Sequence, residues 1–373
     1  MTSLHTKTPN LLETLEEIIN NTSIQSNLTI THPDYQPLEL VEAVANSLEK
    51  LPPEIQEKYL HLQLRTFIHS IYFDGSLQLL RDDGINDNLK TEEPNLENNT
   101  VRGINRNYYA ALESNNSGKG FYEPGWKVIQ QEDELLVVRK DDFNLHIEPE
   151  THLKKSERNP QISDIVAVLM PNNRLQQGYY IAIGDGGFVN MHLSEKNKFN
   201  INKSVDIYFN FTPQIAPDIV KELTQQLNTF GIPFSFKVAY DQEECLHRYD
   251  SGILNIESDD YDRVRPILQK IYADTRSMMP LAYRTTDFRP QVPLFTKYLA
   301  PGLSLAEVPE SVFTSNETFG KNRCRIVADA LLDKYRSQNR TSISCIKQQF
   351  ANNNISLQQP YLNPNSQDIY GFE

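Results

Sequence analysis

The sequence has few cysteines and no long apolar run. Its three cysteines, Cys245, Cys324 and Cys345, are odd in number and far apart. This spacing excludes a disulfide framework and a zinc knuckle, and it indicates a reducing compartment. No apolar stretch approaches the roughly 20 residues of a membrane-spanning helix. The start MTSLHTKTPN lacks the basic and apolar parts of a signal peptide. We therefore expect a cytoplasmic protein without a membrane partner.

Positive charge is also scarce. The 36 Lys and Arg residues are outnumbered by 49 Asp and Glu residues, which gives a formal net charge of −13. Nucleic acids and anionic membranes are polyanions, so this balance argues against general affinity for either, and no nucleic-acid partner is expected. The chain can nevertheless build a core, because 39% of its residues are hydrophobic and it holds 18 tyrosines and 17 phenylalanines. With 373 residues it is long enough for two domains or one large one.

Familiar catalytic signatures are missing. The sequence contains no GxxxxGK[ST], HExxH, GxSxG or CxxC motif. The run GDGG at 184–187 lacks the spacing and the following helix of a phosphate loop, so it predicts an ordinary turn. The eight histidines do not cluster. We predict neither a metal nor a cofactor.

Apolar residues at helical spacing mark the first part of the chain, so residues 9–80 are expected to be helical. Pro52 and Pro53 break the pattern between the last two of its three clearest stretches. Residues 81–104 are polar and Asn-rich, which is typical of a linker or long loop. We place a domain boundary near residue 95, between a helical region (1–95) and a second domain (96–373). The three stretches are LLETLEEIINN, PLELVEAVANSLEKL and PPEIQEKYLHLQLRTFIHSIYF.

Strand patterns begin after residue 105. Residues 125–149 read as strands with a turn at Gln131–Glu134, and the lone Trp126 is expected in the core. DIVAVLMP and GYYIAIGDGG also read as strands. The predicted class is therefore α+β, with a helical N-terminal region followed by a mixed-sheet domain and flanking helices. Three later segments have helical spacing, namely 215–231, 258–274 and 323–336, the last of these being the final clear helix.

The segment between residues 205 and 255 has the clearest candidate for chemistry. Side chains alternate faces along a strand, so VDIYFNF directs one set of apolar residues to a core and a polar set to the other face. In FSFKV the same alternation places Lys237 opposite its flanking phenylalanines. If these two strands are neighbours on one core, a tyrosine, an amide and a lysine share a surface that can transfer protons. The apolar set is Val205, Ile207, Phe209 and Phe211, and the polar set is Asp206, Tyr208 and Asn210.

Lys237 and Arg248 each allow two interpretations. Burial disfavours the charged form of a lysine, which would help Lys237 act as a base, but an exposed sheet face is the simpler alternative. Arg248 can bind an anion through two nitrogens, or it can pair with Asp250 in a turn. Further basic residues can converge on one oxyanion or lie on a solvated surface. These are Arg284, Arg289, Lys297, Lys321, Arg323 and Arg325.

Several segments together resemble the HopA-type effector family, which includes type III effectors of plant pathogens and the lyases of class V lanthipeptide and thioamitide biosynthesis. The N-terminal half, with ESNNSGKGFYEPGWKV, is similar to cyanobacterial members. The resemblance implies elimination of phosphate from phosphoserine or phosphothreonine in a precursor peptide, which leaves dehydroalanine or dehydrobutyrine. It also implies a separate kinase-like protein as partner. The segments that carry it are GYYIAIGD, DIYFNF, LTQQLNTFGIPFSFKV, HRYDSGILNI, PLFTKYLAPGLSLAEVPE, ETFGKNRCRIVADALL and PYLNPNSQDIY.

The resemblance also implies roles for individual residues. Lys237 would remove the α-proton. The spacing of the phosphothreonine lyases of pathogens would make Tyr208 the acid and Arg248 a phosphate ligand. Strand alternation, rather than the resemblance, adds Asn210 to this catalytic group. Two more residues, Lys297 and Arg323, would bind phosphate, and the acid stays open among Tyr208, His146 and His192.

Two residues depart from the family pattern. The strand reads D-x-Y-x-N, with Asp206 where an arginine is expected, and Asn255 stands where a tyrosine is expected. Two like charges about 4 Å apart repel by roughly 4 kcal/mol at an effective dielectric of 20, enough to impair binding of a phosphate dianion. The alternative function is therefore a non-catalytic module of the same fold that binds a peptide or a kinase-like partner. An effector-like protein delivered to a host is a third possibility.

Overall fold

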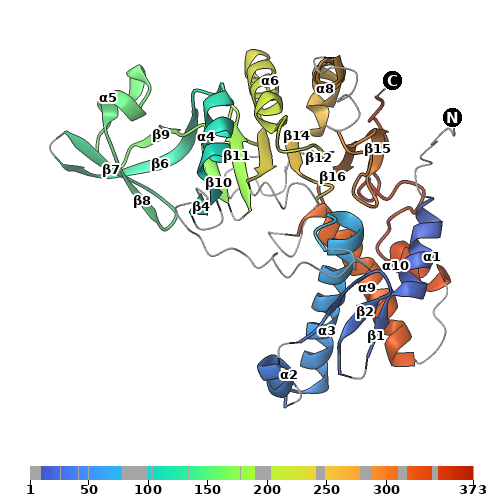
Figure 1. Ribbon diagram of the computed structural model, residues 1–373. Coiled ribbons are helices and arrows are strands. Elements are labelled where there is room, and N and C mark those ends of the chain that lie inside the picture. Colours follow the sequence, from blue (N-terminus) through green and yellow to red (C-terminus); the bar gives the residue numbers. More distant parts are fainter. Residues whose placement is uncertain are drawn as a thin grey trace.

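The computed structural model confirms the α+β class, with a helical N-terminal region, a large antiparallel sheet and a smaller one (Figure 1). Within the described residues, no helix combines the length and the hydropathy that crossing a membrane requires. The structure describes residues 10–25, 27–40, 42–48, 50–77, 100–101, 104–132, 134–176, 178–189, 203–240, 248–277, 288–309, 317–337 and 343–372.

The apolar spacing predicts helix throughout residues 9–80, but the N-terminal region is only partly helical. A three-stranded antiparallel sheet interrupts it between α1 and α2. The β-branched residues around Ile30 favour extended backbone, and the turn at Pro33 and Asp34 reverses the chain between two strands. The elements are α1 (Leu11–Asn21), β1 (Ser23–Ile24), β2 (Ile30–His32), β3 (Tyr35–Leu38), α2 (Glu42–Leu48), α3 (Pro53–Ile68) and the π-helix η1 (His69–Phe73).

The large sheet has seven strands in the order β10-β11-β13-β14-β12-β16-β15, and every neighbouring pair is antiparallel. The sequence analysis treats β12 and β13 as possible neighbours, but in the structure β14 lies between them. A long helical connection, α6, separates β12 from β13 and leaves room for a strand between them. The strands are β10 (Asn173–Gln176), β11 (Tyr179–Ile183), β12 (Ser204–Phe209), β13 (Ser235–Ala239), β14 (Gly252–Glu257), β15 (Lys297–Ala300) and β16 (Leu303–Glu307).

One face of this sheet is the predicted apolar face. Ile207, Phe236 and Leu254 come from three adjacent strands, are paired in register and are fully buried. Helices α6 (Ala216–Thr229) and α8 (Tyr261–Ser277) lie along one side of the sheet (Figure 1). In α6 the predicted stripe of Ile219, Val220, Leu223 and Leu227 is buried in the same core. Burying a side chain of this size contributes about 1.5–3 kcal/mol, so this face holds the sheet and helices together.

The N-terminal helices share that core with the C-terminal helices. Helix α3 packs against α9 (Phe319–Ser337), and α1 packs against α10 (Ile343–Asn352). The sequence analysis does not predict α10, whose polar composition hides the buried pair Ile346 and Phe350 one turn apart. The boundary predicted near residue 95 lies outside the described residues, and helices on its two sides pack into one hydrophobic cluster.

The smaller sheet has its own core. Its four strands run in the order β8-β7-β6-β9, with the predicted turn between β6 and β7, and Trp126 is buried there as expected. The predicted turn at Gly184–Gly187 is also present. Helix α4, which the sequence analysis misses, starts at the cap Asn105, whose side chain accepts a hydrogen bond from the Tyr108 backbone nitrogen. The remaining elements are β4 (Thr100–Val101), β5 (Ile104–Asn105), α4 (Arg106–Asn115), β6 (Phe121–Glu132), β7 (Leu135–Lys140), β8 (Phe143–Ile147), α5 (Pro149–His152), η2 (Lys155–Glu157), β9 (Ile165–Met170) and η4 (Ser258–Asp260).

Candidate functional site

The second face of the large sheet holds the predicted polar residues. Lys237 on β13 is paired with Ile253 on β14, which is paired in turn with Tyr208 on β12. Two residues further along each strand, Asn255 is paired with Asp206. Directly opposed residues lie on the same face, as do residues two apart on one strand. The register therefore brings Lys237, Tyr208, Asp206 and Asn255 onto one face, although β12 and β13 are not neighbours.

Lys237 is the unpaired member of this group. Its side chain is partly buried, and its ammonium has no hydrogen bond or ion pair within the described residues. Its charge acts on the carboxylate of Asp206, which lies across β14. A lysine that is free of a salt bridge in a partly buried site has the accessibility that a base requires.

Asp206 is anchored in the same face. Asn255 donates a hydrogen bond of 2.8 Å from Nδ2 to Asp206 Oδ1, and the Tyr208 hydroxyl lies 3.5 Å from Oδ2. Burial raises the pKa of Asp206, while the Asn255 hydrogen bond, the charge of Lys237 and the Tyr208 hydroxyl act in the opposite direction. The carboxylate therefore belongs to the site and does not point away from it.

Tyr208 lies beneath the N-terminal region. Its side chain is 2% exposed, and its ring meets that of Phe73 from η1 edge to face at 5.6 Å. Burial, followed by the negative charges of Asp206 and Asp250, raises the pKa of Tyr208 well above its usual value. The phenol therefore keeps its proton near neutral pH and can act only as a donor of it.

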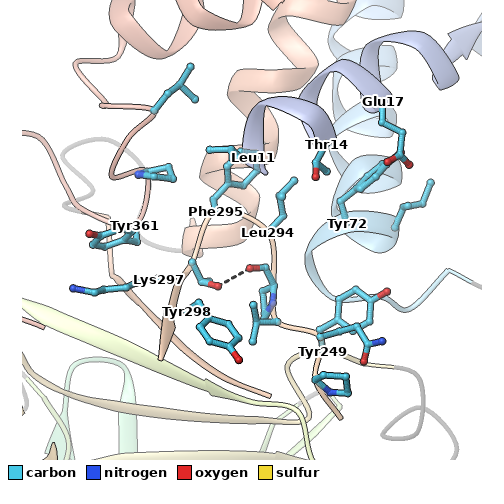
Figure 2. Close-up of a pocket in the computed structure, with 18 of the residues that line it drawn as sticks. Leu11, Thr14, Glu17, Tyr72, Tyr249, Leu294, Phe295, Lys297, Tyr298 and Tyr361 are labelled. Atoms are coloured by element: carbon cyan, nitrogen blue, oxygen red, sulfur yellow. Dashed lines mark hydrogen bonds between the residues drawn. The ribbon is translucent and has the colours of Figure 1, made fainter. Parts of the chain in front are cut away.

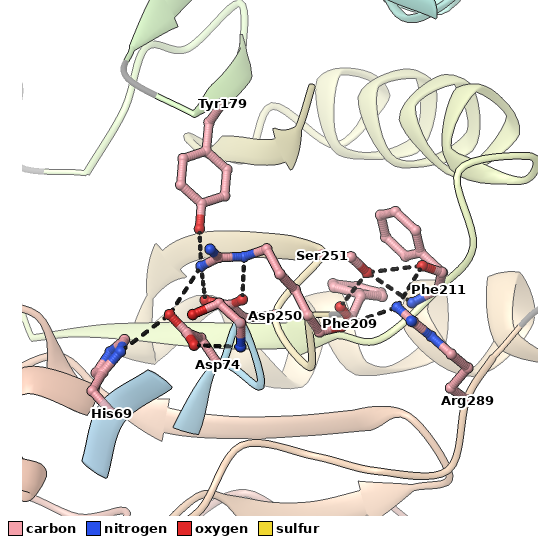
Figure 3. Close-up of polar contacts among 10 residues, drawn as sticks. His69, Asp74, Tyr179, Phe209, Phe211, Asp250, Ser251 and Arg289 are labelled. Carbon is pink, nitrogen blue, oxygen red and sulfur yellow. Dashed lines mark hydrogen bonds and ion pairs between the residues drawn. The ribbon is translucent and has the colours of Figure 1, made fainter. Parts of the chain in front are cut away.

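Arg248 is part of a buried ion-pair network next to this face (Figure 3). Its Nε and Nη2 donate to the two carboxylate oxygens of Asp250 at 2.9 and 3.1 Å, which confirms the turn pair that the sequence allows. Nη2 also donates to the Tyr179 hydroxyl at 2.7 Å and lies 3.5 Å from Asp74 Oδ2. No hydrogen bond is made by Nη1 within the described residues, so one edge of the guanidinium stays available.

Electrostatics keep this network ionised at Arg248 and Asp74. Burial works against the charged guanidinium, but Asp250, Tyr179 and Asp74 raise the pKa of Arg248 overall. Burial also opposes ionisation of Asp74, yet its contact with His69 Nδ1 at 3.1 Å and the charge of Arg248 lower the pKa of Asp74. For Asp250 burial prevails and raises the pKa. The network ties η1 to β11 and to the start of β14.

The chain's family follows from its sequence between the small sheet and the C-terminus. Residues 170–362, just over half of the chain, match the HopA1 effector protein family. The protein belongs to this family. The matched region contains the whole Lys237 face and Arg248, whereas His69 and Asp74 come from outside it.

Two solved structures are similar to parts of this HopA1-family chain. One is the effector protein from Pseudomonas syringae pv. tomato strain DC3000, with 20% identity, coverage of 44% of this chain and 58% of that one, and a TM-score of 0.34. The other is the effector protein from Pseudomonas syringae pv. syringae strain 61, with 16% identity, coverage of 69% and 81%, and a TM-score of 0.40. Comparison with curated proteins gives no match.

Two predicted phosphate ligands of the HopA1-family protein, Lys297 and Arg323, have partners of their own. Lys297 on β15 is in register with Leu305, and so belongs to a row on the apolar face; its Nζ lies 2.6 Å from Asp368 Oδ2. Arg323 is 1% exposed, and its guanidinium donates at 2.8 Å each to the backbone carbonyls of Pro360 and Leu362. Burial lowers the pKa of Arg323 to about 10. Neither side chain contacts Arg248 within the described residues, although Tyr208 of the candidate site acts electrostatically on Arg323. A role of Lys297 and Arg323 in binding phosphate stays a prediction.

Two further predicted residues, Asn210 and His146, are described by the structure. Asn210 follows β12, is 1% exposed and donates from Nδ2 to the Gln291 carbonyl at 2.9 Å. Its catalytic role stays a prediction. His146 lies on β8 of the small sheet, 3.6 Å from Glu132. His192 lies outside the described residues. Of the two candidate acids that the structure describes, Tyr208 and His146, only Tyr208 lies on the Lys237 face.

Sequence reasoning misses three members of the Arg248 network. Asp74 and His69 precede Arg248 by 174 and 179 residues, and Tyr179 lies in a strand predicted only from its apolar pattern. No local spacing joins them, so only the Asp250 partner is visible in the sequence. Within the described residues, no group of three or more His, Cys, Asp or Glu side chains is placed to hold a metal ion.

Proposed function

We propose that this HopA1-family protein is a carbon–oxygen lyase that eliminates phosphate from phosphoserine or phosphothreonine in a precursor peptide. The observation that supports it is the unpaired side chain of Lys237, which lies on the same face as Asp206 and the phenol of Tyr208. The products are dehydroalanine or dehydrobutyrine and inorganic phosphate. A kinase-like protein supplies the phosphorylated peptide, and the reaction takes place in the cytoplasm.

The reaction needs one base and one acid. The Lys237 amine takes the α-proton of the phosphorylated residue, and the electrons of that bond form the Cα=Cβ double bond. The Cβ–O bond breaks, and the phosphate leaves with the bonding pair. Tyr208 donates a proton to the departing oxygen. Asp206 is the second candidate for this acid, because burial raises its pKa and so favours the protonated carboxyl group. Enzymes commonly assign acid and base roles in this way, through environments that shift the pKa values of two groups apart.

Arg248 is the cation that can approach the phosphate. Its Nη1 edge is unoccupied within the described residues, and an arginine nitrogen bound to a phosphate oxygen stabilises the charge that develops as the group leaves. Asp250, Asp74 and Tyr179 hold the guanidinium in position. A held arginine needs no reorganisation during the reaction, which is the advantage of such a network.

A second function is favoured by the charges around Arg248. Asp74 and Asp250 both contact this arginine, and Asp206 adds a third carboxyl group to the neighbouring face. A phosphate dianion is repelled by ionised carboxylates. Under this alternative, the HopA1-family protein binds a peptide or a kinase-like partner without catalysis, and Asp206 marks a lost phosphate site.

A comparison of three proteins tests the lyase. Synthetic phosphothreonine and phosphoserine peptides are incubated with the wild type, with Lys237→Ala and with Lys127→Ala, and loss of phosphoric acid is followed by mass spectrometry. Lys127 is an exposed strand lysine of the small sheet and serves as the matched control. We expect Lys237→Ala to lose activity by at least about 100-fold, and Lys127→Ala to keep it. Undiminished elimination by Lys237→Ala would exclude this lysine as the base.

The Asp206→Arg variant separates the two functions. A non-catalytic module should gain affinity for the phosphopeptides, because the variant restores a cation at the place of a carboxylate. A working lyase that uses Asp206 should instead lose elimination activity. Binding is measured by fluorescence anisotropy and elimination by mass spectrometry on the same peptides.

A further inference from the structure

A cavity separate from the Lys237 face lies between the N-terminal and C-terminal segments. It has a volume of about 620 Å³ and is bounded by α1, η1, the segment 290–298 and the C-terminal segment around Tyr361 (Figure 2). This volume is within the range of about 300–1,000 Å³ that is typical of ligand sites. Five tyrosines line it, namely Tyr35, Tyr72, Tyr249, Tyr298 and Tyr361.

The charge of this cavity is negative. Glu17 and Lys297 are its two charged lining residues within the described chain, and Lys297 is neutralised by Asp368 at 2.6 Å. Glu17 has no cationic partner among the described residues and accepts a hydrogen bond from the Tyr72 hydroxyl at 3.4 Å. Figure 2 shows Glu17 beside Tyr72 at one end of the cavity and Lys297 beside Tyr361 at the other. The Glu17 end therefore has a carboxylate that is available to a ligand.

Two of the tyrosines, Tyr35 and Tyr72, keep their protons and are affected by the charge of Glu17. Burial raises the pKa of Tyr35 to about 12, with further contributions from Tyr249, Glu17 and Asp34. Burial also raises the pKa of Tyr72, again with Glu17 adding to the effect. Neutral phenol rings attract cations through their faces, and the carboxylate attracts them directly.

We propose that this cavity binds a basic side chain, lysine or arginine, of an extended peptide. Its ammonium or guanidinium pairs with Glu17, and its aliphatic stem packs among the tyrosine rings. Aromatic rings together with a carboxylate bind organic cations. An anionic ligand would meet only one cation in the lining, Lys297, which is already paired with Asp368.

The position of the cavity supports a peptide as the ligand. Tyr249 lines the cavity and directly follows Arg248, and its backbone nitrogen donates to the Asp74 carbonyl at 2.8 Å. In η1, Tyr72 lines the cavity while its neighbour Phe73 packs on Tyr208 of the candidate site. A peptide with its phosphorylated residue at Lys237 would have a flanking segment near this cavity, and this part of the inference rests on the proposed function.

The test uses peptide binding without chemistry. The probe is a fluorescein-labelled, unphosphorylated peptide of Ser and Ala with one lysine, and its partner peptide has norleucine at that position. Anisotropy is measured with the wild-type chain, with Glu17→Gln and with Glu16→Gln. Glu16 is the neighbouring exposed glutamate of α1 and does not line the cavity, so it is the matched control.

We expect the lysine peptide to bind more tightly than the norleucine peptide, and Glu17→Gln to weaken it by about 3-fold to 10-fold. The Glu16→Gln variant should bind as the wild type does. Equal binding of both peptides, or equal effects of the two substitutions, would overturn the proposal. Competition by N-acetyl-lysine methylamide at the concentration of the peptide would assign the cavity to a small amine and would also overturn it.

Lys237→Ala separates this inference from the proposed lyase. That variant should lose elimination but bind the lysine peptide as the wild type does. If the wild type shows lysine-dependent binding but no elimination, the lyase fails and the cation site stands. If elimination proceeds and binding ignores Glu17, the cation site fails and the lyase stands.

Discussion

Asn255 donates a hydrogen bond of 2.8 Å to Asp206, and the two residues are directly paired in register on β14 and β12. These are the two positions at which the chain departs from the pattern that the family resemblance implies. The departures are therefore physically connected: an amide donor stands opposite a carboxylate acceptor. An arginine at position 206 and a tyrosine at position 255 would reverse this direction, because a guanidinium can only donate whereas a phenol oxygen can accept. Asp206 and Asn255 form one altered unit of the site.

Asp206→Asn should change the pH dependence of stability. The folded-state pKa of Asp206 is raised above its unfolded value, so the folded state holds this proton more tightly. The contribution of Asp206 is then most favourable below the unfolded pKa of 3.8, and it is lost as the pH rises through the folded pKa. Urea unfolding of wild type and variant from pH 3.5 to 7 measures this. The wild type should lose stability relative to the variant with rising pH, and a constant difference would contradict the prediction.

Arg248→Ala should destabilise the fold by about 3–5 kcal/mol, because it leaves the buried carboxylates of Asp74 and Asp250 without their cation. Urea unfolding at pH 7 gives the difference. Arg139→Ala is the control, since Arg139 is exposed and bonds only to the side chain of Asn144 among the described residues. That change should be within about 0.5 kcal/mol of zero. Similar losses in both variants would show that the network contributes little.

Tyr208→Phe should distinguish the two candidate acids. The ring packs against Phe73 and is kept by the substitution, so the loss of stability should be only about 1 kcal/mol. If Tyr208 donates the proton, elimination from a phosphothreonine peptide should fall by about 100-fold to 10,000-fold. Single-turnover mass spectrometry measures the rate. An unchanged rate would move the acid role to Asp206, and Asp206→Asn should then abolish the reaction.

Arg323→Met should affect stability and leave phosphate affinity unchanged. The guanidinium bonds to the carbonyls of Pro360 and Leu362, so its removal leaves buried acceptors unpaired, each at a cost of about 1–3 kcal/mol. Thermal unfolding gives the loss of stability, and inhibition by inorganic phosphate in the elimination assay gives the affinity. A folded variant with several-fold weaker phosphate inhibition would instead support a role of Arg323 in binding phosphate.

Local patterns account for much of the fold. The alternation in VDIYFNF places Ile207 and Phe209 in the core, and both are buried on the face covered by α6. The spacing of α6 and the turn before β7 are also visible in the sequence, because each depends on contacts within a few residues. The short strands β1 to β3 and the helix α10 escape prediction, since their few apolar residues carry a weak periodic signal.

By itself, the sequence determined the α+β class, the apolar face of the large sheet, the family and the choice of Lys237 as the residue to test. Only the tertiary structure decided which strands are neighbours and which charges meet. The residues next to an arginine in the sequence do not reveal whether it binds a phosphate or a carboxylate. For Arg248 the decision depends on Asp74, which directly follows η1 and is brought close only by folding. Burial then makes an unpaired charge costly, so partners far apart in sequence define this site.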